Sequence, residues 1–392
     1  MQKNVMTKLV RLGEKSPKSA SIPKTVPIYM SSSFSFDDVE TLEKIYSSEE
    51  KGYVYSRISN PGHDVLKGIL SEIDEGQAAQ VYSSGMAAIT MSILAHVKSG
   101  DHIIAGNVLY GGTFQLLKEE LQKFNIEVTF INLQEDNIES CFKNNTKLVY
   151  VETISNPLME VTDIRTISDI SHKHNAKLIV DNTFATPIVC QPLKLGADIV
   201  VYSATKYLCG HSDVMAGAVI SDKETIEKTS HTGCLYGPTM SPFDSWILTR
   251  SLRTLELRIK QHSDNALKLA QYLEGHDKVK KVYYPGLSSS KTYNLAEDMF
   301  NNNLFGGMLS VDLVGGEKAV CDLIRTLESI KFVPSLAGVA TSLSYPVRTS
   351  HRAMNDEELE KAGISKGLLR ISTGLENIND IIAEFDEAFK KI

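Results

Sequence analysis

The sequence predicts an α/β fold, in which a mostly parallel sheet flanked by helices is followed by a smaller C-terminal α+β domain. Short apolar runs such as HIIAG (102–106) and KLIVDN (177–182) alternate with segments of helical periodicity up to residue 221. Strands that alternate with helices form βα units, whose parallel strands are buried on both faces. Beyond residue 252 the apolar runs are shorter and lie between helical segments, which indicates the second domain.

The predicted boundaries divide the chain into residues 1–60, 61–252 and 253–392. Residues 1–60 are rich in Ser, Pro and Lys and show little periodicity, so they are either an arm lying over a neighbouring subunit or a disordered tail. The expected helices are 64–75, 85–98, 114–124, 164–174, 242–275 and 378–392. The expected strands of the larger sheet are 78–82, 102–106, 126–131, 147–152, 177–182, 198–203 and 217–221. Those of the smaller domain lie within 278–286, 306–316, 338–346 and 367–374.

Composition excludes several classes of protein. A net charge of −7 over 392 residues disfavours a nucleic-acid surface, which needs a basic excess. The sequence contains no apolar run of the roughly 18 residues that a membrane span needs, and its first residues lack the apolar core of a secretory signal. The five cysteines are widely spaced and form no CxxC pair, so we expect neither a zinc knuckle nor a disulfide framework, but a reducing cytoplasm.

Polar residues follow several of the predicted strands, where ligands of open α/β sheets bind. They are Ser83, Ser84 and Gly85 after the first strand, Glu152 and Asn156, Asp181 and Asn182, and Ser203, Thr205 and Lys206. If the strands are parallel neighbours, these side chains converge at one edge of the sheet.

Lys206 ends the run VYSATK (201–206) and is flanked by two hydroxyl residues. A lone lysine there is usually a surface charge, but an amine with a lowered pKa could instead form an imine with an aldehyde cofactor. Ser203 and Thr205 would then bind a phosphate. Asp181 could merely cap the next helix, or it could pair with a pyridinium nitrogen, which needs a carboxylate to stay protonated.

Three further features fit the same cofactor, and each also has a simpler explanation. Ser84, Gly85 and Met86 open a helix whose N-terminus can bind an anion, although Ser84 could be an ordinary N-cap. Tyr110, followed by two glycines, could stack on a flat ring and donate a proton, or could pack in the core. Arg370 lies inside an apolar strand and could bind a substrate carboxylate or form an internal salt bridge.

These motifs together resemble the cystathionine/methionine-metabolism family of pyridoxal 5'-phosphate (PLP) enzymes with the fold-type I, PLP transferase-like architecture. The resemblance runs from YSRISNP (55–61) to GLLRISTGLEN (367–377), and its most specific parts are VDNTFATP (180–187) and SATKYLCGH (203–211). It implies that Lys206 carries the cofactor as a Schiff base and shuttles protons, that Asp181 pairs with the pyridine nitrogen, and that Tyr110 stacks on the ring.

The resemblance also assigns the remaining contacts. It implies that the phosphate is bound by Ser84, Gly85, Met86, Ser203 and Thr205, joined by Tyr55 and Arg57 of a partner subunit. Asn156 and Arg370 would contact the cofactor oxygen and the substrate carboxylate, with Thr341 near the same carboxylate. The family is usually a tetramer built from dimers that share their active sites, so residues 1–60 are expected to form an intersubunit arm. No metal, nucleic acid or membrane is expected to take part.

The implied reaction is γ-elimination from a sulfur amino acid (methionine, cystathionine or homocysteine), giving a 2-oxo acid, ammonia and a thiol or cysteine. The alternative is γ-replacement, as in cystathionine γ-synthase or O-acetylhomoserine sulfhydrylase. Five residues depart from patterns typical of subclasses: Gly112 in LYGGTF, Ala340, the pair Gly233–Cys234, and Arg348, which could contact a second substrate anion or be a surface arginine. The substrate therefore stays open at this point.

Two interpretations lie outside this kind of enzyme. One is a regulatory protein that keeps the PLP-enzyme fold without catalysis, which is disfavoured because each cofactor-contacting position is filled. The other is a dinucleotide-binding protein, which is disfavoured because no GxGxxG follows the first predicted strand.

Overall fold

The computed structural model describes residues 21–352 and 354–392, and contains two sheets. The larger has seven strands in the order β1-β7-β6-β5-β4-β2-β3. Their bounds are β1 (Ala78–Tyr82), β2 (His102–Gly106), β3 (Glu127–Ile131), β4 (Thr146–Glu152), β5 (Lys177–Asp181), β6 (Ile199–Ser203) and β7 (Gly217–Ser221). Strands β3, β2, β4, β5 and β6 are parallel, and β7 is antiparallel to both neighbours. The predicted mostly parallel sheet is confirmed.

Helices cover both faces of this sheet, because alternate strand residues are buried in different clusters. In β5, Leu178 and Val180 belong to one hydrophobic cluster, whereas Ile179 between them belongs to another. The helices around the sheet are α3 (Pro61–Asp74), α4 (Gly85–Leu94), α5 (Gly111–Gln115), α6 (Ile164–Lys173), α7 (Thr186–Val189) and α8 (Lys223–Tyr236). Asn60 and Ser84 cap the N-termini of α3 and α4 by accepting backbone hydrogen bonds from Gly62 and Ala87.

The second sheet has five strands in the order β10-β11-β12-β9-β8. Its strands are β8 (Val279–Tyr283), β9 (Met308–Leu313), β10 (Lys331–Phe332), β11 (Ser342–Ser344) and β12 (Leu368–Ser372). Helix α9 (Pro242–Leu252) packs against α3, and the helices of the second half are α10 (Leu255–Glu274), α11 (Tyr293–Met299), α12 (Gly316–Thr326), α13 (Asp356–Lys361) and α14 (Ile378–Phe389). The predicted smaller α+β part of the fold is confirmed.

Two sequence-based expectations need correction. The helix expected over 114–124 is irregular, because α5 is followed by a π-helical turn (Leu116–Glu120) and a 3₁₀ turn (Leu121–Phe124). The helix expected over 242–275 is two helices, since Thr254 leaves helical geometry and the carbonyl of Ser251 accepts a hydrogen bond from buried Arg258. Residues 1–60 include a helix, α2 (Val39–Tyr46), although residues 1–20 lie outside the described part of the chain.

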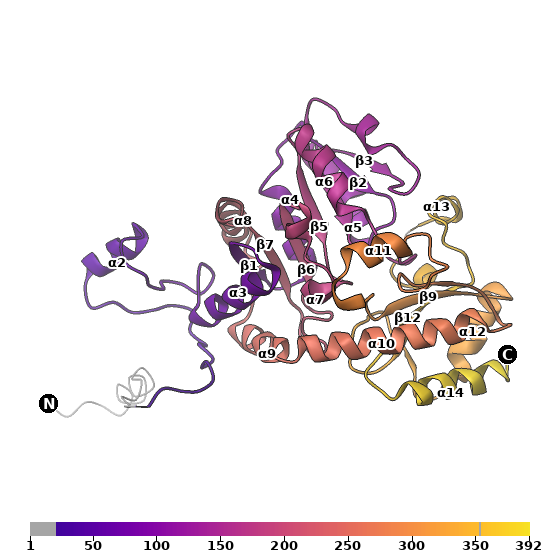
Figure 1. Cartoon of the computed structure of the whole chain (residues 1–392). Coiled ribbons are helices and arrows are strands. Elements are labelled where there is room, and N and C mark those ends of the chain that lie inside the picture. The colour runs from indigo at the N-terminus through magenta and orange to yellow at the C-terminus, as the bar shows by residue number, and fades with distance from the viewer. Residues whose placement is uncertain (1–20, 353) are drawn as a thin grey trace.

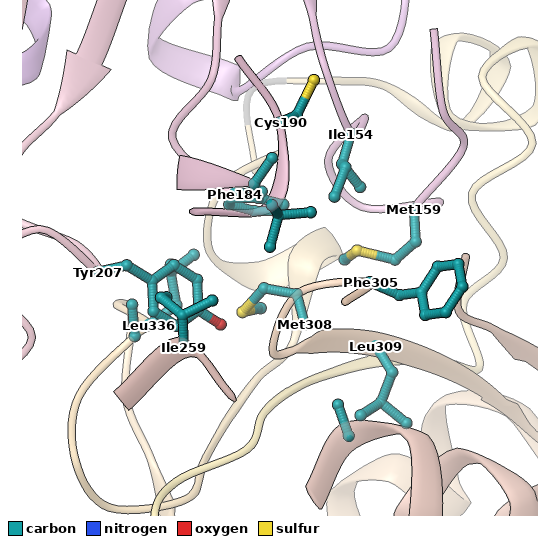
Figure 2. Close-up of a cluster of buried hydrophobic side chains, with 14 of the residues drawn as sticks. Ile154, Met159, Phe184, Cys190, Tyr207, Ile259, Phe305, Met308, Leu309 and Leu336 are labelled. Carbon is teal, nitrogen blue, oxygen red and sulfur yellow. The ribbon is translucent and has the colours of Figure 1, made fainter. Parts of the chain in front are cut away.

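A continuous core joins the two sheets. Figure 2 shows Ile154, Phe184 and Tyr207, which come from the larger sheet's side, gathered with Met308 and Leu309 of β9. Helix α10 runs along β9 and contributes Ile259 to the same cluster (Figures 1 and 2). Because both halves share one apolar core, loops from the second sheet are held against the carboxyl ends of β4–β6. Among the described residues, the structure contains no helix that is both long and apolar enough to cross a membrane.

Asp74, at the end of α3, is fully buried with one carboxyl oxygen accepting from the hydroxyl of Tyr202 at 2.8 Å. Its other oxygen has no hydrogen-bond partner, and burial raises the pKa of Asp74 to about 8. The folded chain therefore holds a proton there that the unfolded chain, with a carboxyl pKa of 3.8, releases.

We expect the free energy of unfolding to fall as the pH rises from about 4 to about 8, by on the order of a few kcal/mol, and then to level off. Asp74→Asn keeps an acceptor for Tyr202 without the ionisable proton, so it should remove this part of the slope. Urea midpoints at pH 6 and 8.5 would measure it, with exposed Asp169→Asn as the control. If the midpoints at pH 6 and 8.5 differed as much in Asp74→Asn as in wild type, Asp74 would not be the source of the pH dependence.

Candidate active site

A cavity of about 520 Å³ lies at the carboxyl ends of β4, β5 and β6. The strand register explains why the ends of these three strands lie together. Glu152 of β4 is paired with Asp181 of β5, and Asp181 is paired with Val201 of β6. The loops after these strands therefore open into one space, which loops of the second sheet close. Most of the residues predicted from the sequence line this cavity: Ser84, Gly85, Met86, Tyr110, Asn156, Asp181, Ser203, Thr205, Lys206 and Arg370.

Lys206 lies just after β6, and its ε-amine donates a 3.0 Å hydrogen bond to the hydroxyl of Ser335. No carboxylate of the described residues forms a salt bridge with it. Burial, together with the positive charge of Arg370, lowers the pKa of Lys206 to about 8. A much larger fraction of this amine is thus neutral near physiological pH than of an ordinary lysine, as suits a nucleophile or base, and it is not a surface charge.

Two carboxyl groups form the floor of the cavity. Asp181 accepts a hydrogen bond from the backbone N–H of Thr183 at 3.0 Å and another from the hydroxyl of Tyr150 at 3.2 Å. Neither Thr183 nor Tyr150 belongs to α7, the helix that follows β5, so Asp181 is not the cap of that helix. Burial raises the pKa of Asp181, and the pKa of Glu152 is raised by its own burial and then by Asp181. A cationic partner would lower the pKa of Asp181 and stabilise its charged form.

An anion-binding corner lies where α4 begins. Ser84 is the N-cap of α4, and the N–H groups of Gly85 and Met86 in the first turn have no acceptor within the helix. Gly85 is pressed against Ser203, since a Cβ at position 85 would come within 2.6 Å of the Cβ of Ser203. Thr205 completes the corner, with its hydroxyl accepting from the N–H of Ala216 at 2.9 Å. Ser84 is therefore both a cap and part of this corner.

Gly85→Ala should weaken binding of the anion at this corner. The new methyl group would push the start of α4 away from the backbone and side chain of Ser203. We expect the affinity for the phosphate-bearing cofactor to fall by roughly 10-fold or more, the loss of one good charged hydrogen bond. Equilibrium titration of the apoprotein measures this, and Gly68→Ala, in open space on α3, is the control. Equal affinity of the two variants would contradict the close approach.

Arg370 of β12 is buried and donates a 2.7 Å hydrogen bond from Nη1 to the side-chain oxygen of Asn156. Its Nε has no partner, and the guanidinium forms no salt bridge with the described residues, so an internal salt bridge is the wrong interpretation. Burial lowers the pKa of Arg370 to about 10, which leaves it charged at neutral pH. A buried cation without a counter-ion is costly, and a ligand carboxylate would satisfy it.

Tyr110 lies at the rim and is 43% exposed, so it does not pack in the core. Its backbone N–H donates to Glu152 at 2.7 Å. Gly112 lies under the tyrosine ring, because a Cβ there would come within 2.7 Å of a ring carbon. A side chain at position 112 would thus tilt the ring, and glycine leaves it room to lie flat over a ligand.

Three predicted residues do not line the cavity of this chain. Tyr55 and Arg57 lie elsewhere, where Arg57 donates to the backbone oxygen of Cys234 at 2.8 Å. Thr341 is buried with its hydroxyl donated to Glu376 at 2.9 Å, and it also accepts from the N–H of Gly374. The structure thus shows Thr341 bound to Glu376 and not among the residues that line the cavity.

Sequence reasoning left several cavity residues without a role. The sequence analysis places Glu152 at a strand end but gives no role to Ser335 and Arg352 of the cavity, nor to Tyr150, which is not part of the cavity lining and donates to Asp181. Tyr150 lies two positions before Glu152 on β4, so the period of two along a strand could have identified it. Ser335 and Arg352 reach the site from loops of the second sheet, and a single sequence carries no signal for that approach.

These residues fit PLP. The fit rests on a buried amine with a lowered pKa, a carboxyl group on the neighbouring strand end, and an anion corner whose glycine leaves no room for a Cβ. In the described chain no group of three or more His, Cys, Asp or Glu side chains is placed to hold a metal ion.

Comparison with known proteins agrees with this geometry. Residues 6–390 match the family model described as Cys/Met metabolism PLP-dependent enzyme. The chain is 40% identical to L-methionine gamma-lyase of Fusobacterium nucleatum subsp. polymorphum, covering 94% of this chain and 93% of that one. It is 39% identical to cystathionine beta-lyase of Lactococcus lactis subsp. cremoris, over 99% of both chains.

Among solved structures, a putative O-acetylhomoserine (thiol)-lyase from Campylobacter jejuni superposes with a TM-score of 0.89 at 31% identity. It covers 93% of this chain and 95% of its own, and it contains N'-pyridoxyl-lysine-5'-monophosphate. Both the resemblance inferred from the motifs and the fold expected with it are confirmed. The chain belongs to the family of PLP-dependent enzymes of cysteine and methionine metabolism.

Proposed function

We propose that the protein is a carbon–sulfur γ-lyase that acts on sulfur amino acids and releases a 2-oxo acid, ammonia and a thiol or cysteine. The observation that carries the proposal is the joint placement around one cavity of the Lys206 amine, the Asp181 carboxyl group and the Arg370 guanidinium, whose Nε has no partner. Relatives at about 40% identity that are named lyases support elimination as the reaction.

Each residue has a distinct task in this proposal. PLP, when bound, supplies an aldehyde for the amine and an electron-withdrawing ring that acidifies the carbon next to the substrate nitrogen. Lys206 binds the cofactor covalently and later takes protons from the α- and β-carbons, which its lowered pKa permits. Asp181 keeps positive charge on the ring nitrogen. Arg370 and Asn156 hold the α-carboxylate, and Tyr110 protonates the departing sulfur.

The second candidate is γ-replacement, in which a thiol adds where the leaving group departed. The structural similarity to an O-acetylhomoserine (thiol)-lyase favours keeping it. The two reactions share the same first half, so the residues that bind the cofactor do not discriminate between them.

A substrate panel separates the candidates. Methionine, cystathionine, homocysteine and O-acetylhomoserine are each assayed for 2-oxo acid and ammonia, with and without added thiol. We expect release of ammonia and 2-oxo acid from a thioether or thiol substrate without any added thiol. Product formation that requires thiol, without ammonia, would favour replacement.

We further propose that residues 21–60 form an intersubunit arm and that Tyr55 and Arg57 reach the phosphate corner of a partner. The exposed surface beside Arg57 is apolar, with Ile58, Leu235 and Tyr236 between 45% and 72% exposed. Helix α2 buries none of its residues and stands away from the rest of the chain (Figure 1). A tetramer made of two such dimers would cover these surfaces. The five free cysteines support a cytoplasmic location.

A further inference from the structure

The mouth of the cavity carries two arginines that the proposed reaction does not use. Arg348 and Arg352 both line the cavity and are both exposed. The acidic residues of the cavity wall, Glu152 and Asp181, are buried at their strand ends and already accept hydrogen bonds. The mouth therefore presents positive charge that the wall of the cavity does not balance.

The segment that carries these arginines is held at several points. The hydroxyls of Thr349 and Ser344 are 2.9 Å apart, and the ring of His351 lies 3.2 Å from the backbone oxygen of Leu109. The carbonyl of Ser350 sits so close to Gly111 that a Cβ there would come within 1.7 Å of it. The segment is thus fixed between β11 and the Tyr110 loop.

Both guanidinium groups are available to a ligand. The guanidinium of Arg352 makes no hydrogen bond, ion pair or ring contact with the described residues. Arg348 pairs with Glu317 of α12 at 2.6 Å, but both side chains are well exposed, at 64% and 40%. An exposed ion pair contributes little to stability, so a ligand carboxylate could replace Glu317 at small cost.

We propose that Arg348 and Arg352 form a subsite for a second carboxylate, carried by the group that leaves from the γ-carbon. This inference rests on the proposed function, in which Arg370 binds the α-carboxylate at the inner end of the same cavity. The favoured substrates are then amino acids with a carboxylate beyond the γ heteroatom, linked through a thioether as in cystathionine or through an ester as in O-succinylhomoserine. Methionine, which ends in a methyl group, gains nothing from the subsite.

The test compares the double variant Arg348→Gln/Arg352→Gln with wild type on cystathionine, O-succinylhomoserine and methionine. Loss of the two charged contacts should lower kcat/KM for a carboxylate-bearing substrate by about 10- to 100-fold, mainly through KM. For methionine the change should stay within about 3-fold. Arg325→Gln removes an exposed arginine outside the cavity and is the matched control. The substrate whose kcat/KM falls in the double variant shows whether the subsite serves a thioether, as in cystathionine, or an ester, as in O-succinylhomoserine.

Glu317→Gln provides the opposite change, because it frees Arg348 without touching the cavity wall. We expect it to lower KM for the same substrate. Raising the salt concentration should reduce kcat/KM more steeply for that substrate than for methionine, and this difference should vanish in the double variant. An equal loss for methionine in the double variant, or no loss for either carboxylate-bearing substrate, overturns the subsite.

Calorimetric titration of the PLP-loaded protein separates this inference from the proposed function. If the wild type cleaves no carbon–sulfur bond, the lyase proposal fails by itself. Cystathionine or O-succinylhomoserine that still binds more tightly than methionine, with the difference lost in the double variant, would support the subsite independently of turnover. Equal binding of all three ligands would overturn it.

Discussion

Replacing Lys206 by alanine is expected to lower turnover by on the order of 10³-fold or more, since a positioned base alone contributes about 10²- to 10⁴-fold. The variant also loses the amine that binds the cofactor covalently. Its fold should persist, because the Lys206 amine makes one side-chain hydrogen bond, to Ser335. Steady-state assays and the cofactor absorbance before and after borohydride treatment measure both effects.

Ser335→Ala is the matched control for Lys206→Ala. It removes the hydrogen-bond acceptor and leaves the amine, so cofactor attachment should survive and turnover should drop by no more than about 10-fold. Equal turnover in Lys206→Ala and wild type would refute the assignment of the base. If both variants lose turnover equally and neither binds the cofactor covalently, the effect of Lys206→Ala would come from a change in local structure and not from loss of the amine.

The pH dependence of cofactor attachment follows from the same amine. The neutral form is the nucleophile, and the pKa of Lys206 is lowered to about 8 by burial and by Arg370. The rate of attachment to the apoprotein should therefore rise from pH 6.5 to about 8 and level off above it. A rise that continues beyond pH 10 would mean that the amine is not desolvated.

The residues at the floor of the cavity could be predicted from the sequence because each one directly follows a strand that the sequence also predicts. Asp181, Ser203 and Lys206 each follow an apolar run, and parallel strands end at the same edge of a sheet. The cavity residues that come from loops of the second sheet could not be predicted in this way. Thr341 and Arg352 lie eleven positions apart in one loop-rich segment, yet Arg352 lines the cavity and Thr341 does not, because its hydroxyl is bound to Glu376.

The break between α9 and α10 illustrates the same limit. Residues 252–255 read LRTL and contain neither proline nor glycine, so the local sequence gives no stop signal. The break is fixed by tertiary contacts of buried Arg258, which donates to the carbonyls of Tyr207, Leu208 and Ser251. Two of these follow Lys206 directly, so the break also holds the segment that carries the Lys206 amine.

The second large effect is expected from mixing two inactive proteins. Tyr55→Ala/Arg57→Ala should be inactive without added cofactor, because the phosphate loses its contacts from the arm, and Lys206→Ala is inactive by loss of the amine. If the arm serves a partner's cavity, a mixed dimer contains one site with an intact Lys206 and an intact Arg57. Random co-assembly should then restore about a quarter of the wild-type activity per site, since half of the dimers are mixed and half of their sites are complete.

Asp181→Ala with Lys206→Ala is the matched control pair, because both residues line the cavity of one chain. No mixed dimer of that pair contains a complete site, so co-expression should restore nothing. Restoration by both pairs would point to exchange of whole domains. No restoration by either would place Arg57 with its own chain, where the structure already gives it the Cys234 carbonyl as a partner at 2.8 Å. The experiment thus decides whether that contact persists in the assembled enzyme or is exchanged for the neighbour's phosphate.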